Sequence, residues 1–231
     1  RPDGTPHPVG HVLRNPELAQ VLRNIAAIGP LALHEGPVAR AMVAKVQQHP
    51  LRPGTLSLDD MKRYQPKERE ALCFDHRAAA SALRICGFPP PSSGAVAVGQ
   101  ILGLLARTPQ GAQPLAGVPD ADWLHTYMEA SRLAFADRAQ YLGDPDFVAA
   151  PGGGWQSLLA PRYLDDRARS ITPARAPQVT PGQPGGTPSA WARMPDQPEY
   201  GTSHISITDR WGNALAMTTT IEAGFGSRMM V

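Results

Sequence analysis

Small polar and apolar side chains alternate along residues 202–207 and again along residues 214–221. Because successive side chains of a strand point to opposite faces, this period of two predicts two β-strands. Residues 209–213 contain aspartate, glycine and asparagine, which favour a reversal of the chain. The pattern therefore predicts a β-hairpin with Ile205 on one face and His204 on the other.

The length of the turn sets which residues of the two predicted strands oppose each other. If Thr208 pairs with Ala214, the register places Thr202 directly opposite Thr220 on the same face. Two hydroxyl groups then meet at the open end of the hairpin. The alternative is an ordinary half-buried hairpin, since threonine is a good strand former.

Upstream of this hairpin, apolar residues recur at the spacing of amphipathic helices. Asn15 before Pro16 predicts a capped helix start, and Gly29 predicts the end of that helix. Ser57, with an acid three residues later, predicts a second capped start for a short helix that ends before Pro66. Further helices are predicted over residues 37–47, 95–106 and 122–141, with a short candidate over 157–168.

The predicted helix over residues 95–106 is apolar almost all round, which predicts burial on every side. Ser92, Ser93 and Gly94 precede it and are expected to cap it, in preference to binding an anion there.

Two charged pairs occur in the predicted helix over residues 122–141. Glu129 and Arg132 are three apart and are expected to pair on the outside. Asp137 and Arg138 are adjacent and do not face each other on a helix, so structural salt bridging or loop anchoring is favoured over an acid–base pair.

The composition excludes several classes of partner. The 231 residues carry a net charge of +2 with both signs interspersed, which is not typical of a nucleic-acid or anionic-membrane surface. No apolar run is long enough to span a bilayer. The two cysteines, Cys73 and Cys86, are too few for a disulfide scaffold. They are not accompanied by other metal-ligating residues, so no metal or cofactor is expected. Small buried thiols are favoured over a single bridge.

Residues 151–201 are rich in proline and glycine, and only the candidate over 157–168 has a helical period. They predict a linker. It is either a flexible connection that lets a newly cut end move away or an ordinary interdomain linker, and composition fits both.

Thr202 is the candidate nucleophile. A threonine hydroxyl is a poor nucleophile unless it is activated, and a free α-amine on the same residue is one known base, with a pKa of about 7.7–8.0. That chemistry requires a cut before Thr202. Gly201 precedes it, and glycine allows a strained peptide and close attack on its carbonyl. His204 lies two residues along the same strand, which favours a neutral structural histidine over a general base.

Short runs of residues occur in a specific order along the chain. They include Asn15-Pro16-Glu17-Leu18-Ala19, Leu56-Ser57-Leu58-Asp59-Asp60, Ala136-Asp137-Arg138, Thr202-Ser203-His204-Ile205-Ser206, Thr218-Thr219-Thr220 and Phe225-Gly226-Ser227. In this order they resemble the γ-glutamyltranspeptidase family of N-terminal-nucleophile hydrolases, over nearly all of this chain but only the middle of the family's length.

The resemblance implies an α+β fold, a partial αββα sandwich with a mostly helical upstream part and a C-terminal β-hairpin. It divides the chain into a helical part of a large subunit (1–150), a linker that ends at a self-cleavage site between Gly201 and Thr202 (151–201), and the start of a small subunit (202–231). The residues themselves do not indicate a location, and the resemblance implies a periplasmic or secreted one.

The implied activity is γ-glutamyl transfer or hydrolysis, with a glutathione-type donor and an amino acid, peptide or water as acceptor. Thr202 and Thr220 are the implied catalytic residues, with Thr220 orienting the Thr202 hydroxyl. Thr218 and Glu222 are the implied substrate-binding residues. Acidic, serine-rich and glycine segments of the same polypeptide are missing here, so the fragment alone is expected to be inactive.

Glu222 departs from the family pattern, which commonly has asparagine after the paired threonines. An ionised glutamate repels a substrate carboxylate, whereas asparagine can donate to it. The donor is therefore expected to differ from glutathione, and a glutaryl-type cephalosporin acylase of the same family is the alternative enzyme. A helical binding domain that never processes is the non-enzyme alternative.

Overall fold

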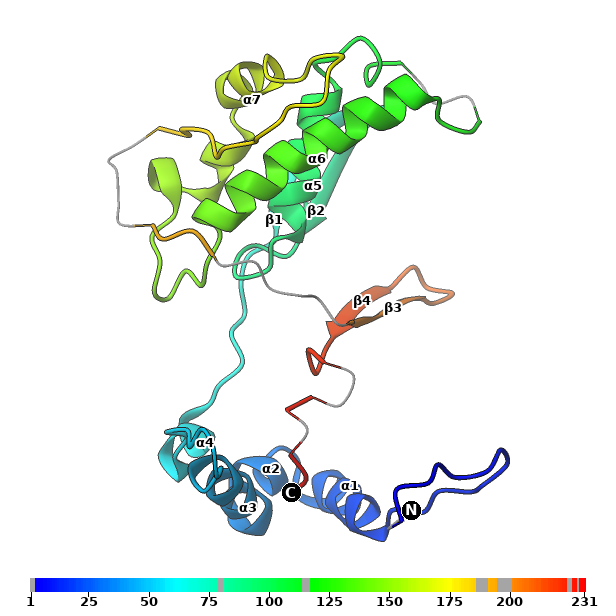
Figure 1. Ribbon diagram of the computed structural model, residues 1–231, viewed down its shortest axis with the longest axis vertical. Helices are drawn as coiled ribbons and strands as arrows, with labels where there is room; N and C mark the ends of the chain where they lie inside the picture. The colour runs from blue at the N-terminus through cyan, green and yellow to red at the C-terminus, as the bar shows by residue number, and fades with distance from the viewer. Residues whose placement is uncertain are drawn as a thin grey trace. The chain divides into compact units, whose positions relative to one another are not determined.

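A computed structural model describes residues 3–78, 81–113, 117–185, 191–194, 201–223, 226–227 and 229–231. The chain divides into two compact units, Arg1–Lys67 with Pro198–Val231, and Glu68–Gln197. Each unit contains helices and one two-stranded antiparallel sheet among its described residues (Figure 1). The expected mixture of helices and strands is thus confirmed. None of the helices described is long and apolar enough to cross a membrane.

The first unit contains the helices α1 (Pro16–Ile28), α2 (Leu31–His34), α3 (Gly36–Gln47) and α4 (Leu58–Arg63). Helices α1 and α4 begin where the sequence predicts capped starts. The Asn15 side chain accepts a 2.9 Å hydrogen bond from the N–H of Leu18. Ser57 Oγ accepts from the N–H of Asp60, and the Asp60 carboxylate accepts from the N–H of Ser57. Helix α2 was not predicted, since its 4 residues are too few to display a period.

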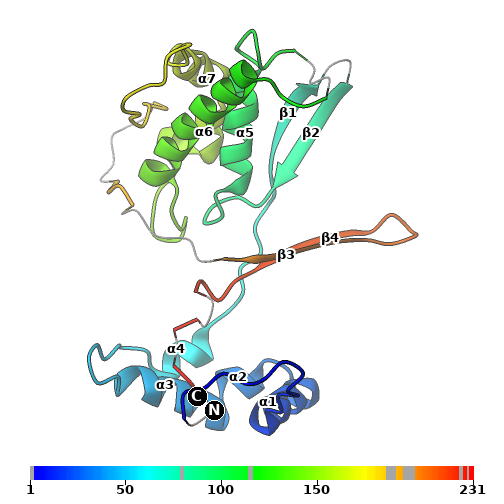
Figure 2. The ribbon, with the colours of Figure 1, turned by 45° about the vertical axis from the view of Figure 1, so that its right-hand side comes forward.

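The predicted hairpin of the first unit is confirmed (Figure 2). Its strands are β3 (Ser203–Thr208) and β4 (Ala214–Thr219). Thr208 opposes Ala214, as the expected register requires. Ile205 opposes Met217 on one face, and both side chains are exposed.

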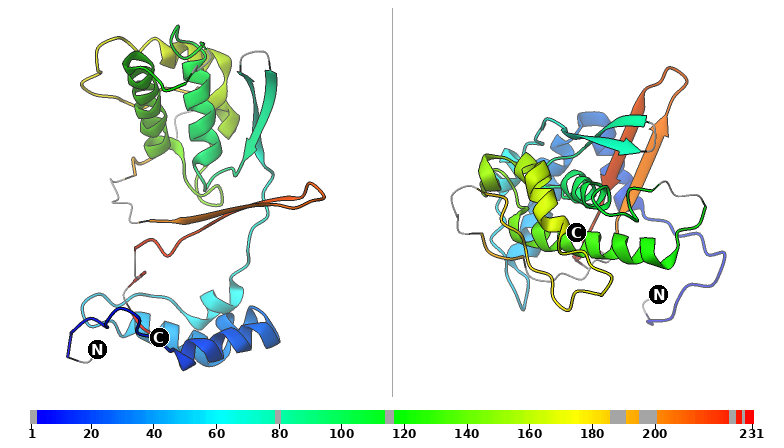
Figure 3. Two further views of the ribbon diagram at one scale, coloured as in Figure 1. Left: turned by 90° about the vertical axis from the view of Figure 1, so that its right-hand side faces the viewer. Right: turned by 90° about the horizontal axis from the view of Figure 1, so that it is seen from above.

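The second unit contains β1 (Leu72–Ala78), β2 (Ser81–Gly87), α5 (Gly94–Leu105), α6 (Ala121–Tyr141), the 3-10 helices η1 (Pro151–Gly153) and η2 (Trp155–Leu159), and α7 (Pro161–Ala168). Helix α5 lies between the β1–β2 hairpin and α6 (Figure 3). The single helical candidate over 157–168 is wrong: Ala160 has extended backbone, because the residue before a proline disfavours the helical region, and Pro161 starts a new helix.

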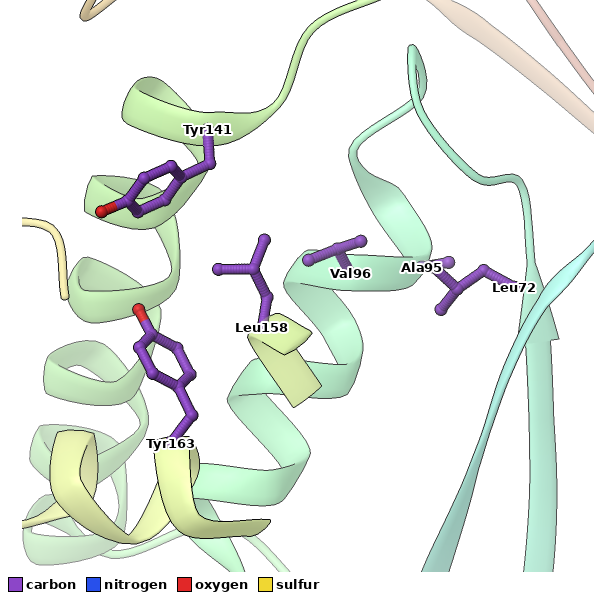
Figure 4. Packing of buried hydrophobic residues seen from close by; sticks show 6 residues of the cluster. All are labelled: Leu72, Ala95, Val96, Tyr141, Leu158 and Tyr163. Carbon is purple, nitrogen blue, oxygen red and sulfur yellow. The ribbon is translucent and has the colours of Figure 1, made fainter. Parts of the chain in front are cut away.

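The core of the second unit forms around α5. One cluster consists of Leu72, Ala95, Val96, Tyr141, Leu158 and Tyr163 (Figure 4). A second consists of Leu104, Leu105, Ala130, Leu133 and Leu164. Burial of each Leu or Val side chain stabilises the fold by about 1.5–3 kcal/mol. The expectation that α5 is buried on every side is wrong, because Val98 is 47% exposed.

The β1–β2 hairpin was not predicted, and it corrects the interpretation of the cysteines. Cys73 and Cys86 oppose each other across the strands and form a disulfide, with their Cα atoms 4.1 Å apart. Neither residue is fully buried. Directly opposed cysteines on paired strands are close enough to bridge, so the expectation of separate buried thiols is wrong.

Ser93 does not cap α5, which corrects a second expectation. Its backbone is already helical, so its side chain does not reach the first-turn N–H groups. Instead Ser93 Oγ accepts a 3.0 Å hydrogen bond from Nε of Arg138. Arg138 therefore anchors the turn that leads into α5.

Asp137 is 1% exposed and is the acceptor at the centre of a buried network. Its Oδ2 accepts from Gln100 Nε2 at 2.8 Å and from the Tyr163 hydroxyl at 2.6 Å. Its Oδ1 accepts from Arg167 Nη2 at 3.0 Å and from the N–H of Gly182 at 2.8 Å. Burial, followed by the charge of Asp137, raises the pKa of Tyr163 far above its ordinary value, so this hydroxyl stays protonated. The predicted anchoring role is confirmed.

Glu129 and Arg132 pair as expected, at 2.6 Å, but not on the outside. The Glu129 side chain is only 4% exposed, and it also accepts a 3.2 Å hydrogen bond from the N–H of Ala176. The carboxylate therefore attaches residues beyond α7 to α6.

The proline- and glycine-rich stretch also contacts α6 further along. Gln140 Nε2 donates to the carbonyl of Trp191 at 3.0 Å, and the N–H of Met194 donates to the carbonyl of Ala139 at 2.8 Å. Residues 191–194 are thus hydrogen-bonded to the last turns of α6, in the same compact unit.

Candidate active site

The open end of the β3–β4 hairpin forms a hollow with a volume of about 360 Å³. Its lining brings together three of the predicted site residues, Gly201, Thr202 and Thr220. The other lining residues are Ser203, Thr219, Ile221 and Ala223. The candidate nucleophile and the peptide bond that it is expected to attack therefore share one site.

Thr220 contacts the peptide bond before Thr202. Its hydroxyl donates a 3.1 Å hydrogen bond to the carbonyl oxygen of Gly201. Its oxygen in turn accepts a 2.9 Å hydrogen bond from the backbone N–H of Glu222. In this uncut chain the hydroxyl proton of Thr220 therefore points to the carbonyl. The expected contact with the Thr202 hydroxyl stays a prediction for the cut chain.

The backbone is unusual on both sides of this contact. Gly201 has a φ of +134°, a region that glycine tolerates and other residues rarely adopt. Glu222 has a φ of +68°, which costs a non-glycine residue about 1–2 kcal/mol. In this left-handed conformation the backbone N–H of Glu222 donates to the hydroxyl oxygen of Thr220, and the Glu222 side chain is exposed.

His204 lies between hydroxyl groups on the polar face of the hairpin. Its Nδ1 is 2.8 Å from Oγ1 of Thr218, and its Nε2 is 3.1 Å from Oγ of Ser206. Both ring nitrogens therefore have partners within the hairpin, as the structural interpretation of this histidine requires. Thr218, a predicted substrate-binding residue, is held by His204 and is not among the residues that line the hollow.

Asp209 supports the site from the opposite end of the hairpin. One carboxylate oxygen accepts 2.9 Å hydrogen bonds from the N–H groups of Trp211 and Asn213, and the other accepts from Asn213 Nδ2 at 2.8 Å. The Asn213 side chain, and then the turn N–H groups, hold the pKa of Asp209 below its ordinary value. The sequence marks this residue only as a turn former. Its contacts fix the turn, and with it the register that brings Thr220 to Gly201.

Among the residues that the structure describes, no group of His, Cys, Asp and Glu side chains is arranged to hold a metal ion. The chemistry that this site can support comes from its hydroxyl groups and backbone donors. A hydroxyl group that a base activates can attack a carbonyl.

Comparison with known proteins identifies relatives of the whole chain. The family model described as gamma-glutamyltranspeptidase matches residues 1–231. Glutathione hydrolase 2 of Arabidopsis thaliana is 35% identical over 223 residues, which are 96% of this chain and 35% of that protein. The Acylase ACY 1 proenzyme of Pseudomonas sp. (strain V22) is 32% identical over 226 residues, which are 98% of this chain and 36% of that protein.

A solved structure has a similar fold. The γ-glutamyltranspeptidase from Pseudomonas nitroreducens, determined in complex with L-DON, has a TM-score of 0.62 and 32% sequence identity to this chain. The similarity covers 75% of this chain and 49% of that chain.

Proposed function

Because this chain belongs to the γ-glutamyltranspeptidase family, we propose that the full-length protein transfers or hydrolyses γ-glutamyl groups through a threonine acyl-enzyme. The observation that carries the proposal is the contact of Thr220 with the carbonyl of Gly201, in the hollow that Thr202 also lines. The chain spans 35–36% of the length of the curated relatives compared above, so the activity is proposed for the longer polypeptide.

The first step is self-cleavage. The Thr202 hydroxyl oxygen attacks the carbonyl carbon of Gly201, the C–N bond breaks, and the hydroxyl proton passes to the departing amine. The resulting ester between Gly201 and Thr202 is then hydrolysed by water, which leaves a carboxylate on Gly201 and restores the Thr202 hydroxyl. The two products are a chain that ends at Gly201 and a chain that begins at Thr202.

The second step uses the α-amine that the cut exposes. With a pKa of about 7.7–8.0, this amine accepts the Thr202 hydroxyl proton near neutral pH. The hydroxyl then attacks the γ-amide of a donor, the amine leaves, and an amino acid, peptide or water takes the acyl group. Thr220 orients the hydroxyl, and Thr218 and Glu222, which lie outside the lining of the hollow, bind the donor. Other segments of the polypeptide complete the site.

The proposal extends to the fold and the location of the protein. In the complete polypeptide, the two small sheets are parts of an αββα sandwich, with residues 1–150 and the linker over 151–201 in a large subunit and residues 202–231 in a small one. A periplasmic or secreted location is supported by the Cys73–Cys86 disulfide, because such bonds persist in oxidising compartments.

An acylase among the relatives supports a second candidate activity. Relatives of this chain include a protein named as an acylase. The second candidate is therefore an acylase that acts on glutaryl-type amides. Glu222 has an exposed side chain two residues after Thr220, and an ionised group there repels the carboxylate of a γ-glutamyl or of a glutaryl donor alike.

Intact mass of the full-length protein tests the proposal, with Thr202→Ala as the matched variant. We expect two pieces divided between Gly201 and Thr202 in the parent protein and a single chain in the variant. A single intact chain in both would exclude the nucleophile role and leave a binding domain that does not process.

Release of a chromogenic amine then identifies the donor. Faster release from a γ-glutamyl anilide supports the transferase, and faster release from a glutaryl anilide supports the acylase. A fully cleaved protein that is inert toward both would exclude both enzymes.

A further inference from the structure

We infer that Thr220 has a role in self-cleavage itself: its hydroxyl stabilises the negative charge that develops on the Gly201 carbonyl oxygen when Thr202 attacks. The inference rests on the proposed function and deepens it, because it assigns Thr220 a task before the mature enzyme exists. It starts from the direction of one hydrogen bond. The Thr220 hydroxyl donates to the Gly201 carbonyl oxygen at 3.1 Å, and this is the oxygen of the peptide bond to be cut.

The charge balance of the first step explains why a donor is needed there. As Thr202 Oγ bonds to the carbonyl carbon, the C=O electron pair moves to the oxygen, which becomes an oxyanion. The oxyanion returns its electrons when the C–N bond breaks and the proton reaches the amine. A hydrogen bond to this oxygen strengthens as the charge grows, so it lowers the barrier more than it stabilises the uncut chain.

Glu222 makes Thr220 a better donor through its backbone. The N–H of Glu222 donates to Thr220 Oγ1 at 2.9 Å, so an N–H, a hydroxyl and the carbonyl form one chain of hydrogen bonds. Hydrogen bonds in such chains polarise one another in the same direction. The N–H points to Thr220 because residue 222 has a φ of +68°, an unfavourable conformation for glutamate.

A threonine hydroxyl has a single proton to donate. While that proton is on the Gly201 carbonyl, Thr220 is unable to donate to the Thr202 hydroxyl. After cleavage the Gly201 carbonyl departs, and the same hydroxyl becomes available to orient Thr202. Thr220 therefore serves the two steps in sequence, and the cut itself changes its partner.

The test follows self-cleavage of newly synthesised full-length protein over time in a cell-free translation reaction. Thr220→Val keeps the side-chain shape but removes the donor, whereas Thr220→Ser keeps the donor. Thr208→Val is the matched control, since Thr208 is a strand threonine at the opposite end of the hairpin. We expect Thr220→Val to cleave about 10- to 100-fold more slowly. This effect is smaller than the roughly 100- to 1000-fold loss typical of removing such a donor, because the site is exposed. Thr220→Ser and the control should stay within about threefold of the parent.

Equal cleavage rates of the parent and Thr220→Val would overturn the inference while leaving the proposed function intact. A parent protein that does not cleave at all would instead overturn the proposed function. The same time course would show which of the two has failed.

A second comparison tests the donor chain even if Thr220→Val does not fold. Glu222→Gly keeps the N–H and adopts positive φ freely, whereas Glu222→Val resists it and displaces the N–H. We expect Glu222→Val to cleave at least about fivefold more slowly than Glu222→Gly. Equal rates in these two variants would exclude the part assigned to Glu222.

Discussion

The backbone N–H of Gly182 donates a 2.8 Å hydrogen bond to Oδ1 of Asp137, and this bond attaches the proline- and glycine-rich stretch to α6. Composition alone indicates a linker there, but the chain returns to α6 at Gly182 and again at Met194. The described residues of this stretch up to Met194 are therefore part of the second unit. Residues 195–201 are the remaining link between Met194 and the proposed cut.

Replacing Asp137 tests how much this attachment contributes to stability. Asp137→Asn removes the charge that faces Arg167, whose side chain is 10% exposed, and turns an amide NH₂ toward neighbouring donors. Breaking a buried pair in this way costs about 3–5 kcal/mol. We expect a correspondingly large loss in the free energy of unfolding of the full-length protein, measured by denaturant titration.

Asp166→Asn is the matched control for that measurement. Asp166 lies on α7 and pairs at 2.6 Å with Arg169, the residue that follows this helix, but their side chains are 55% and 77% exposed. Exposed pairs contribute about 0–1 kcal/mol. If both substitutions have equally small effects, the Asp137 network does not hold the stretch in place.

Glu129 gives the protein a pH-dependent contribution to stability. Burial raises the pKa of Glu129, but hydrogen bonds from Arg132 and Ala176 outweigh it and hold the pKa below its ordinary value of 4.5. A carboxyl with a lowered folded-state pKa stabilises fully above its unfolded pKa, and the contribution disappears as pH falls through the folded value.

We therefore expect Glu129→Gln to lower the free energy of unfolding by about 1.5–3 kcal/mol at pH 7, the range for hydrogen bonds to a charged group. The difference between parent and variant should shrink below pH 4.5, as unfolding titrations at pH 7, 5 and 3 would measure. A difference that does not change with pH would show that the carboxylate charge plays no part.

The Cys73–Cys86 disulfide makes the second unit sensitive to reduction. The two cysteines are 13 residues apart, and a bridge across about 15 residues stabilises by about 3 kcal/mol. We expect a reductant to lower the thermal midpoint of the parent protein and to release two thiols. The Cys73→Ser/Cys86→Ser double variant should start at the lower midpoint and not respond to the reductant. Two free thiols in the untreated protein would contradict the bridge.

Local sequence patterns predicted the helices and strands that depend only on residues close together in the sequence. The hairpin at Thr202 follows from alternation and turn residues, and the capped helix starts follow from Asn15 and Ser57. The β1–β2 hairpin escaped prediction because the alanine-rich residues 78–82 favour helix. The disulfide was missed with it, since the facing of two cysteines depends on that strand pairing.

Contacts across long sequence separations were not predictable in the same way. Asp137 receives donors from Gln100 and Gly182, which lie 37 and 45 residues away. At the candidate site, alternation predicted that Thr202 and Thr220 share one end of the hairpin. It did not predict the partner of the Thr220 hydroxyl, because that depends on where the backbone carbonyl of Gly201 lies, which side-chain alternation does not specify.

Glu222 also determines what we expect of the donor. If its carboxylate repels the carboxylate of a bound γ-glutamyl group, Glu222→Asn should lower the KM for a γ-glutamyl anilide about tenfold, which corresponds to about 1.4 kcal/mol. A glutaryl anilide carries a carboxylate but no α-amine, so its KM should fall similarly. Glu222→Gln also removes the charge, but its side chain keeps the length of glutamate. Comparing the two variants therefore separates the loss of repulsion from a new hydrogen bond made by the shorter asparagine. The opposite result, a KM that rises for the γ-glutamyl anilide alone, would mean that Glu222 attracts the α-ammonium group and that the donor is an ordinary γ-glutamyl compound.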